Sequence, residues 1–256
     1  NVLEILQDLA KYHREQLSIP IVGITGTNGK TTSKELIYSV LQSELSCYST
    51  KGNLNNHIGV PLSILEINNE HEIAIIEMGA NHKKEIKFLC NIAKPTHGVI
   101  TNIGSAHLEG FKGLRGVIDA KNELYNFIEE INGSLFVNND DELLVGLAKN
   151  IQKTSYGLNS NLNTSVISNT PFLNVAWGDT VINSRLIGDY QFYNISLAIC
   201  IGNYFKLSKQ NIQFGIESYI PKNNRSEIIE TESNVIIMDA YNANPSSMKA
   251  MITSFS

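Results

Sequence analysis

The segment Thr25–Thr32, with the sequence TGTNGKTT, has the residue types of a phosphate-binding loop. Gly26 and Gly29 allow the backbone to turn tightly and to approach a phosphate, so that backbone N–H groups and the start of a following helix supply positive partial charge. The Lys30 ammonium can reach the β and γ phosphates of a nucleotide, and the Thr31 hydroxyl can bind Mg²⁺. The nucleotide contacts that we predict in this loop are Gly26, Thr27, Asn28, Gly29, Lys30, Thr31 and Thr32.

The spacing of this loop departs from the full phosphate-loop pattern. That pattern, GxxxxGK[ST], requires a glycine where Ile24 stands, so only the shorter string GxxGKT is present. An ordinary glycine-containing turn between a strand and a helix would give the same letters. We favour the phosphate site because a β-branched apolar run, residues 19–25, precedes the loop, and a helical pattern over about 30–45 follows it.

Three further polar side chains lie where an α/β sheet would present them. Glu77 ends an apolar strand pattern, and the carboxyl ends of parallel strands are where open α/β sheets bind ligands. Its carboxylate suits Mg²⁺, which prefers oxygen ligands. His107 follows the next predicted strand, and Lys121 lies inside a predicted helix. Taken singly, each has an ordinary explanation: a strand-end carboxylate, a loop histidine and a solvated helix lysine.

Strands alternate with helices through the first part of the chain. The apolar runs that predict strands are 19–25, 73–78, 98–102 and 134–137, and the segments with helical spacing are 2–17, 30–45, 83–93, 116–130 and 141–150. This alternation predicts an α/β fold in which a mostly parallel sheet carries helices on both faces.

The pattern changes after about residue 154. Short β-like pieces separated by Asn, Ser, Gly and Asp predict a small antiparallel addition over 154–187, and helical spacing returns over 190–207 and 208–218. A linker at 221–225 then precedes a run, 235–239, that we predict to be a buried strand, and a helix that starts near Pro245. These signals divide the chain into an N-terminal helix and linker (1–18), a central domain (19–225) and the truncated start of a second α/β domain (226–256).

The composition limits the classes of function. The net charge of −5 gives no electrostatic reason to expect a nucleic-acid or membrane-surface partner. The three cysteines, Cys47, Cys90 and Cys200, are widely spaced and odd in number, which favours free thiols in a reducing cytoplasm over disulfides. No apolar run approaches the ~18 residues of a membrane span. The first residue is not Met, and we expect the native protein to be longer.

The motifs, in their order, resemble those of the Mur ligase family, and the resemblance covers nearly the whole chain. The string GTNGKTT is typical of the whole family, while GNLNN, EMGANH and DAYNANP point to the branch that adds D-Ala-D-Ala. The strings that carry the resemblance are GTNGKTT at 26–32, GNLNNHIGVPL at 52–62, IIEMGANHKKEI at 75–86, TNIGSAHLEGF at 101–111, AKNELY at 120–125 and DAYNANPSSM at 239–248.

The resemblance implies a phosphate-loop central domain, a Rossmann-like second domain and an ATP-dependent ligase that acts through an acyl phosphate. It gives catalytic roles to Lys30, Glu77, His107 and Lys121. Thr31 and Glu77 would bind one Mg²⁺, while His107 and Lys121, the latter matching a carbamylated lysine, would serve a second. Asn194 matches an adenine contact, and the further nucleotide contacts that the resemblance implies are Arg225, Asp239 and Asn242.

Two strings depart from the family pattern. The family has a His-Asn pair in a Gly-x-His-Asn stretch before the adenine-contacting Asn, whereas this chain has Gly188-Asp-Tyr-Gln191. The linker reads Asn224-Arg225 where Gly-Arg is usual. These departures concern the Asn194 and Arg225 assignments and leave the phosphate-site assignments untouched.

The substrates implied are ATP, UDP-N-acetylmuramoyl-tripeptide and D-Ala-D-Ala, acted on by a cytoplasmic monomer with no nucleic-acid partner. Two alternatives remain open. One is another Mur-type ligase, which would add a different amino acid or extend a folate polyglutamate. The other is a nucleotide-binding module without ligase activity, against which the intact set Lys30, Glu77, His107 and Lys121 argues.

Overall fold

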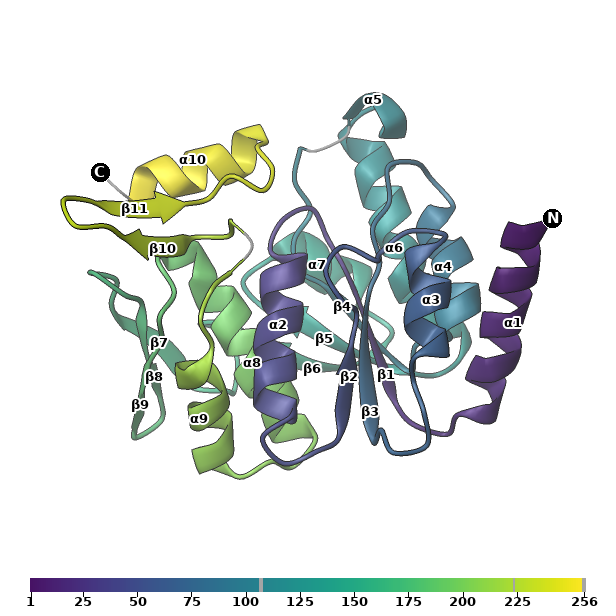
Figure 1. Ribbon diagram of the computed structural model, residues 1–256, viewed down its shortest axis with the longest axis horizontal. Coiled ribbons are helices and arrows are strands. Elements are labelled where there is room, and N and C mark those ends of the chain that lie inside the picture. The colour runs from purple at the N-terminus through teal and green to yellow at the C-terminus, as the bar shows by residue number, and fades with distance from the viewer. Residues whose placement is uncertain (106–107, 223, 255–256) are drawn as a thin grey trace.

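Six parallel strands form the central sheet of the computed structural model, which describes residues 1–105, 108–222 and 224–254 (Figure 1). The strand order is β2-β3-β1-β4-β5-β6, so β1 lies between β3 and β4. All five neighbouring pairs run parallel, as the sequence predicts. The strands are β1 (Ile21–Thr25), β2 (Cys47–Ser49), β3 (Ile73–Glu77), β4 (His97–Ile100), β5 (Ser134–Asn138) and β6 (Gln152–Tyr156).

Helices cover both faces of this sheet, which explains why β1, β3 and β5 are buried along their whole length. Along β3, the side chains of Ile73 and Ile75 enter one core cluster, while Ala74 and Ile76 enter the other. One face carries α2 (Lys30–Leu41), α8 (Phe192–Tyr204) and α9 (Lys209–Ser218); the other carries α1 (Val2–Gln16), α3 (Gly59–Leu65), α4 (Glu85–Ala93), α6 (Leu114–Glu130) and α7 (Glu142–Leu147).

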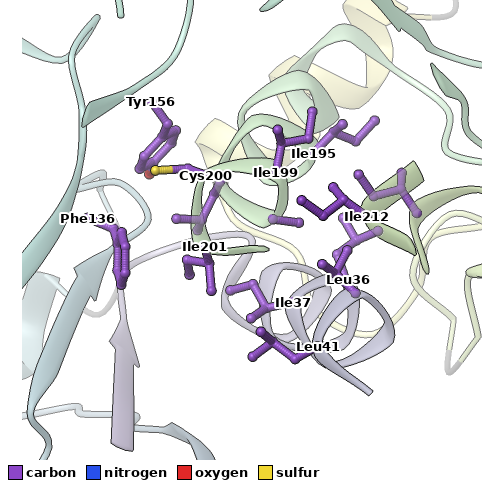
Figure 2. Close-up of a cluster of buried hydrophobic side chains, with 14 of the residues drawn as sticks. Leu36, Ile37, Leu41, Phe136, Tyr156, Ile195, Ile199, Cys200, Ile201 and Ile212 are labelled. Carbon is purple, nitrogen blue, oxygen red and sulfur yellow. The ribbon is translucent and has the colours of Figure 1, made fainter. Parts of the chain in front are cut away.

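The core on the α2 side is shown in Figure 2. Leu36, Ile37 and Leu41 of α2 lie near Ile201 of α8 and Ile212 of α9, and all five side chains are fully buried. Helix α8 is apolar along most of its length because α2, α9 and the sheet surround it. This packing fixes the position of α2, whose first residue is Lys30.

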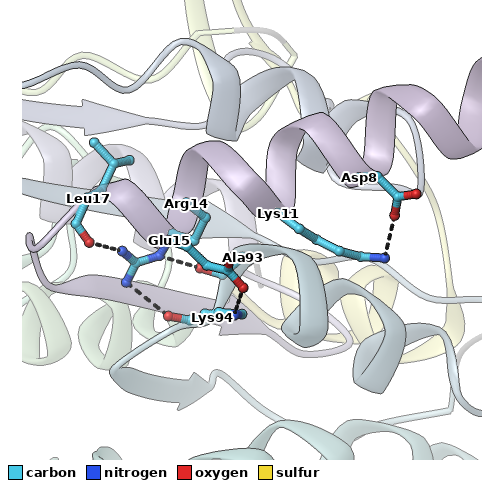
Figure 3. A network of polar contacts seen from close by, with 7 residues as sticks. All are labelled: Asp8, Lys11, Arg14, Glu15, Leu17, Ala93 and Lys94. Atoms are coloured by element: carbon cyan, nitrogen blue, oxygen red, sulfur yellow. Dashed lines mark hydrogen bonds and ion pairs between the residues drawn. The ribbon is translucent and has the colours of Figure 1, made fainter.

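A buried arginine ties α1 to the end of α4 (Figure 3). The Arg14 guanidinium donates to the backbone carbonyls of Ala93 at 2.9 Å, Leu17 at 2.7 Å and Lys94 at 3.1 Å. The Lys94 ammonium returns to α1 and contacts the Glu15 carboxylate at 2.5 Å. The sequence predicts this helix but not the role of the arginine.

Antiparallel pieces complete the described chain. Strands β7 (Thr164–Ser168), β8 (Asn174–Trp177) and β9 (Thr180–Asn183) form the predicted small sheet. The prediction was wrong for residues 154–156, because they belong to β6 and extend the parallel sheet. The remaining elements are α5 (Leu108–Phe111), the 3-10 turn η1 (Asp189–Gln191), β10 (Glu227–Glu230), β11 (Val235–Met238) and α10 (Pro245–Ser254).

Three details of the sequence prediction need correction. Strand β11 is not buried, since Val235 is 67% exposed and, within the described ranges, β10 is the only strand that pairs with it. Helix α4 begins at Glu85 and not at 83, because Lys84 adopts a left-handed backbone conformation. Strand β2 gave no recognisable pattern, because it has only three residues.

The three cysteines are free thiols, as predicted. Within the described ranges, no helix is both long and apolar enough to cross a membrane.

Candidate functional site

The candidate site lies where the strand order of the sheet reverses. Strand β1 lies between β3 and β4, so the loops that follow these three strands meet at one edge. A cleft of about 1790 Å³ opens there, lined by the loop after β1, the segment after β3, the N-terminal part of α6, and residues near β11 and α10. Chain segments far apart in sequence therefore share one cavity.

Two glycines shape the loop between β1 and α2. Gly29 caps α2 in a left-handed conformation with φ 78°, and a Cβ there would lie 3.0 Å from Asn194 Oδ1. At Gly26, with φ 150°, a Cβ would lie only 2.0 Å from Thr101 Oγ1. The loop therefore packs so closely against Thr101 and Asn194 that only glycine fits at these two positions. The N-terminus of α2 lies at the cleft.

The segment after β4 braces this loop. Asn102 accepts from Thr27 N–H through its carbonyl at 3.0 Å and from Asn28 N–H through Oδ1 at 3.0 Å. It also donates from Nδ2 to the Asn28 carbonyl at 2.9 Å, and Thr101 Oγ1 donates to the same carbonyl at 2.7 Å. These bonds engage the N–H groups of Thr27 and Asn28 and the Asn28 carbonyl, so the fold itself holds the loop in this shape.

Lys30 lies folded against the loop. Its ammonium donates to the carbonyls of Gly26 at 2.9 Å and Thr27 at 3.2 Å. Burial lowers the Lys30 pKa, the Glu77 carboxylate opposes this lowering, and the Arg225 guanidinium adds to it. Glu77 and Arg225 therefore both lie within electrostatic reach of Lys30 around the same cavity.

Glu77 is held from one side only. Its Oε1 accepts from Asn55 Nδ2 at 2.8 Å, and its backbone N–H donates to Thr50 Oγ1 at 3.0 Å. The carbonyl of Thr50 in turn accepts from the ammonium of the buried Lys34 at 2.5 Å. The residue is 1% exposed, yet Oε2 has no hydrogen-bond partner within the described part of the chain. An unpaired buried carboxylate oxygen is costly, and a cation would compensate it.

The residues present fit a magnesium ion held jointly with phosphate. Among the described residues, no group of three or more His, Cys, Asp or Glu side chains could hold a metal ion by itself. Mg²⁺ is instead commonly held through one or two carboxylates together with substrate phosphates and water. The orphaned Glu77 Oε2 and the Thr31 side chain line the same cleft as Lys30 and supply hard oxygen donors for such a site.

Lys121 is buried beside the phosphate loop. It is 3% exposed, its ammonium lies 3.5 Å from Thr25 Oγ1, and it stands 5.8 Å from the centre of the Phe111 ring. Burial, reinforced by the charge of Lys30, lowers the pKa of Lys121 to about 7, although the carboxylates of Glu85 and Glu123 oppose the shift. A substantial fraction of this amine is therefore neutral and nucleophilic at physiological pH.

Asn194 lies behind the phosphate loop in a clasp of side-chain hydrogen bonds. Its Oδ1 accepts from Ser33 Oγ at 2.9 Å, and its Nδ2 donates to Gln191 Oε1 at 2.6 Å. Gln191 is the residue by which the chain departs from the His-Asn pair, and it is buried on the 3-10 turn η1. The amide of Gln191 thus fixes which way the Asn194 amide points, and one Asn194 N–H remains for a ligand.

The C-terminal segment contributes polar residues to the same cleft. The Arg225 guanidinium stacks 3.7 Å from the centre of the Tyr241 ring. Asp239 Oδ1 accepts from the backbone N–H of Ser226 at 3.3 Å. Asn242 is exposed and lines the cleft between Tyr241 and α10. A direct contact with the phosphate loop is made by Asn244, which donates from Nδ2 to Asn28 Oδ1 at 2.7 Å.

Almost every site residue predicted from the sequence lies on this cleft. His107 falls outside the described residues. The predicted residues that line the cleft are Gly26, Thr27, Asn28, Gly29, Lys30, Thr31, Thr32, Glu77, Lys121, Asn194, Arg225, Asp239 and Asn242.

Four polar residues that support the site were not predicted as site residues. They are Asn55, Asn102, Ser33 and Gln191, which orient Glu77, the phosphate loop and Asn194. Asn55 and Asn102 lie in motif strings, so the strings marked the right segments without giving the roles. Ser33 gave no signal, because its bond to Asn194 joins residues 161 positions apart and leaves no local pattern. Gln191 lies in the string that departs from the family pattern, three residues before Asn194, but the string did not give its role.

Comparison with known proteins agrees with this geometry. The family model "Mur ligase middle domain" matches residues 24–202. A curated relative, the UDP-N-acetylmuramoyl-tripeptide–D-alanyl-D-alanine ligase of Bacillus subtilis, is 34% identical over 98% of this chain, which spans only 56% of that relative. The UDP-N-acetylmuramoylalanyl-D-glutamyl-2,6-diaminopimelate–D-alanyl-D-alanyl ligase of Acinetobacter baumannii superimposes with a TM-score of 0.86 at 30% identity, covering 99% of this chain and 58% of that one. The MurF ligase of Thermotoga maritima in complex with ADP gives a TM-score of 0.87 at 27% identity, covering 99% and 61%.

The family model covers well over half of the chain, and the parallel sheet, phosphate loop and cleft agree with it. The chain spans little more than half the length of the relatives that it matches. On the match to the family model and the identity to its curated relatives, the chain belongs to the Mur ligase family.

Proposed function

We propose that this chain is the ATP-binding part of a ligase of peptidoglycan precursor synthesis, which adds D-Ala-D-Ala to UDP-N-acetylmuramoyl-tripeptide. The observation that carries the proposal is the unpartnered Glu77 Oε2 in the same cleft as Lys30 and the phosphate loop. The relatives that carry this activity in their names support the choice of substrates. By the name of the Acinetobacter relative, the acceptor peptide carries a D-glutamyl residue before its reacting residue.

The proposed reaction activates a peptide carboxylate as an acyl phosphate. A carboxylate oxygen attacks the γ-phosphorus of ATP and ADP leaves; the amine of D-Ala-D-Ala then attacks the acyl carbon, and phosphate leaves as the amide forms. Such chemistry needs alignment and charge neutralisation more than a protein nucleophile. Lys30 would bind the β and γ phosphates, Asn194 the adenine, and Arg225, Asp239 and Asn242 further parts of the nucleotide.

Glu77 and Thr31 would hold Mg²⁺ together with the phosphates. The ion would neutralise charge on the oxygens of the γ-phosphoryl group while that group is transferred. Lys121, as a carbamate, and His107 would be ligands of a second Mg²⁺. The carbamate forms when the neutral Lys121 amine adds to CO₂, which makes an N–C bond and releases one proton. The depressed pKa and the burial of Lys121 favour this step, because only the neutral amine reacts and the buried product gains a metal-binding oxygen.

We also propose the division at about residues 18 and 225, a cytoplasmic location and a monomeric state for the whole protein. Residues 227–254 form a strand pair and a helix against the cleft, which suits the beginning of a domain that closes over ATP. This fragment alone should bind nucleotide weakly and should not turn over, because the reaction must align three reactants. No observation here favours a different amino-acid substrate, a folate substrate or a non-catalytic module.

Calorimetry with Mg-ADP tests the nucleotide site. Lys30→Ala should weaken binding about ten- to hundredfold, as expected for losing a charge-assisted bond worth ~1.5–3 kcal/mol. Lys149→Ala, which removes an exposed lysine away from the cleft, is the matched control. Equal affinity of wild type and Lys30→Ala would refute the site. For the full-length enzyme, phosphate release that requires both UDP-muramoyl-tripeptide and D-Ala-D-Ala tests the reaction.

A further inference from the structure

Lys84 has an unusual backbone for a lysine. It is the residue before α4, and its φ of 72° places it in the left-handed region that favours glycine. A non-glycine residue in this region costs of order 1 kcal/mol and persists where surrounding contacts determine the conformation. It also lines the cleft, together with the loop after β3.

A carboxylate from α6 determines that conformation. Glu123 Oε1 accepts from the backbone N–H of Lys84 at 2.6 Å, and Oε2 accepts from the backbone N–H of Lys87 at 2.9 Å. The preceding turn is fixed in the same way, because Glu85 Oε2 accepts from the N–H groups of Asn81 at 2.7 Å and His82 at 3.1 Å. The carboxylates of Glu123 and Glu85 therefore both accept from backbone N–H groups, and these bonds hold the backbone of Lys84 in place.

The ammonium groups of the two adjacent lysines differ in their partners. Lys83 makes an ion pair with Asp119 Oδ2 at 2.9 Å. Within the described ranges, the Lys84 ammonium has no carboxylate within ion-pair distance and no hydrogen-bond acceptor. The described part of the chain therefore places the exposed Lys84 ammonium, without an ion-pair partner, at the wall of the cleft.

The position of this cation relative to the reaction centre follows from α6. Lys121 of that helix reaches Thr25 at the phosphate loop, and Glu123, two residues later, holds the Lys84 turn. Helices α4 and α6 pack side by side (Figure 1). One short stretch of α6 thus contacts both the Lys84 turn and the phosphate loop, and both of these line the same cleft.

We infer that Lys84 is a specificity-determining residue whose ammonium binds the free carboxylate of the D-glutamyl residue in the acceptor peptide. This inference rests on the ligase function proposed above. A glutamyl residue has two carboxyl groups, and only one of them forms the peptide link to the next residue. The free carboxylate lies next to the reacting residue, and it is the anionic group that an unpaired cation at this place would recognise.

Steady-state kinetics of the full-length enzyme test the inference with Lys84→Gly. Glycine adopts the left-handed conformation without strain, so the variant should fold, which urea unfolding checks. We expect the KM for the acceptor to rise about fivefold, the size of one partly exposed ion pair, with kcat and the KM for ATP unchanged. Lys84→Arg should stay near wild type, and Lys87→Met, which removes an exposed lysine outside the cleft, should be unaffected.

A second acceptor locates the anion. When the free D-glutamyl carboxylate is replaced by a carboxamide, the wild type should show the same rise in KM, and Lys84→Gly should not distinguish the two acceptors. An unchanged KM in Lys84→Gly overturns the inference. The inference is also overturned if Lys84→Gly raises the KM equally for the carboxylate and the carboxamide acceptor. The anion that Lys84 binds would then lie elsewhere in the acceptor, for example in the diphosphate of its UDP group. Failure of the wild type to use the acceptor and D-Ala-D-Ala would refute the proposed function, and the inference with it.

Discussion

Asn55 donates a hydrogen bond to one carboxylate oxygen of Glu77 at 2.8 Å and leaves the other oxygen without a partner in the described part of the chain. The asparagine lies on the loop before α3, and the glutamate ends β3, so the contact joins two of the motif strings. A buried carboxylate held in this way is oriented by a neutral amide. Its unpaired oxygen is where a cation would be bound.

Glu77→Gln should therefore weaken nucleotide binding only when Mg²⁺ is present. The amide keeps the bond to Asn55 through its oxygen but cannot neutralise a divalent ion. We expect the affinity for Mg-ADP to fall at least about tenfold, or ~1.4 kcal/mol, and the affinity for ADP in EDTA to change little. Calorimetry under both conditions measures this difference. An equal loss with and without Mg²⁺ would show that Glu77 acts on the fold of the loop.

Gln191→Ala should weaken the binding of the base more than that of the phosphates. Without Gln191 Oε1, the Asn194 amide loses the bond that fixes its orientation. We expect ADP affinity to fall about fivefold, or ~1 kcal/mol, the value of one hydrogen bond. Tripolyphosphate, which has no base, should bind equally well to both proteins, and Gln191→Asn offers a shorter amide as a graded control. Parallel losses for ADP and tripolyphosphate would contradict this assignment.

Arg14→Met should destabilise the fold without affecting the site. The substitution removes a guanidinium that donates to four backbone carbonyls, and it leaves buried acceptors unsatisfied. We expect a loss of about 3 kcal/mol in the free energy of unfolding, measured by urea denaturation. Lys11→Met removes a half-exposed cation of the same helix, whose partner Asp8 is exposed, and should cost under about 1 kcal/mol. Similar costs for the two variants would mean that the Arg14 contacts contribute little.

The sequence predicted those parts of the site that are local in the chain. The phosphate loop needs a strand, two glycines and a helix start within about a dozen residues, and Glu77 needs only a strand end, so short strings contain both. The Asn194 clasp was beyond this reasoning, since Ser33 is 161 residues away from Asn194. Arg14 was missed for the same reason, because Ala93, whose carbonyl it binds, is 79 residues away.

The fold was predicted to the same extent and failed for similar reasons. Fully buried strands such as β3 give recognisable apolar runs in the sequence. Strand β2 has only three residues and depends on its pairing with β3. Strand β6 has two exposed residues at its start, because it lies at the sheet edge, and so it read as part of the antiparallel region. Strand β11 is apolar like a core strand, yet it is exposed, because only β10 pairs with it among the described residues.

The pH dependence of stability should reveal the buried amine of Lys121. Its pKa is about 7 in the fold and 10.5 in the unfolded reference, so between these values the unfolded chain holds a proton that the native state lacks. Stability contributed by this group therefore rises with pH across that window, by up to ~1.4 kcal/mol per pH unit.

In CO₂-free buffer, Lys121→Met should accordingly be more stable than wild type at pH 7, and the difference should narrow toward pH 9.5. Urea unfolding at several pH values measures it. Lys87→Met, at an exposed position of α4, should show no such convergence. A constant difference between Lys121→Met and wild type across this range would mean that the amine keeps its ordinary pKa.

Chemical rescue separates the two roles that Lys121 could have in the full-length enzyme. As a carbamate, the side chain is an anionic metal ligand; as a bare amine, it is a cation beside phosphate. Lys121→Ala should lose most activity in either case. A short-chain carboxylate that enters the cavity left by the side chain should restore part of it only if the missing group is an anion.

Lys121→Arg gives the opposite readout. It keeps a cation that cannot form a carbamate, so it should stay inactive if the anion is needed and retain activity if the cation is needed. Assays of Lys121→Ala with and without acetate, beside Lys121→Arg, therefore decide between the roles. Incubation of the wild type with ¹³C-bicarbonate should also give a carbamate resonance that Lys121→Ala lacks. Because metal binding and carbamylation stabilise each other, this resonance should strengthen when Mg²⁺ and nucleotide are added. Rescue of Lys121→Ala by methylammonium and not by acetate would refute the carbamate.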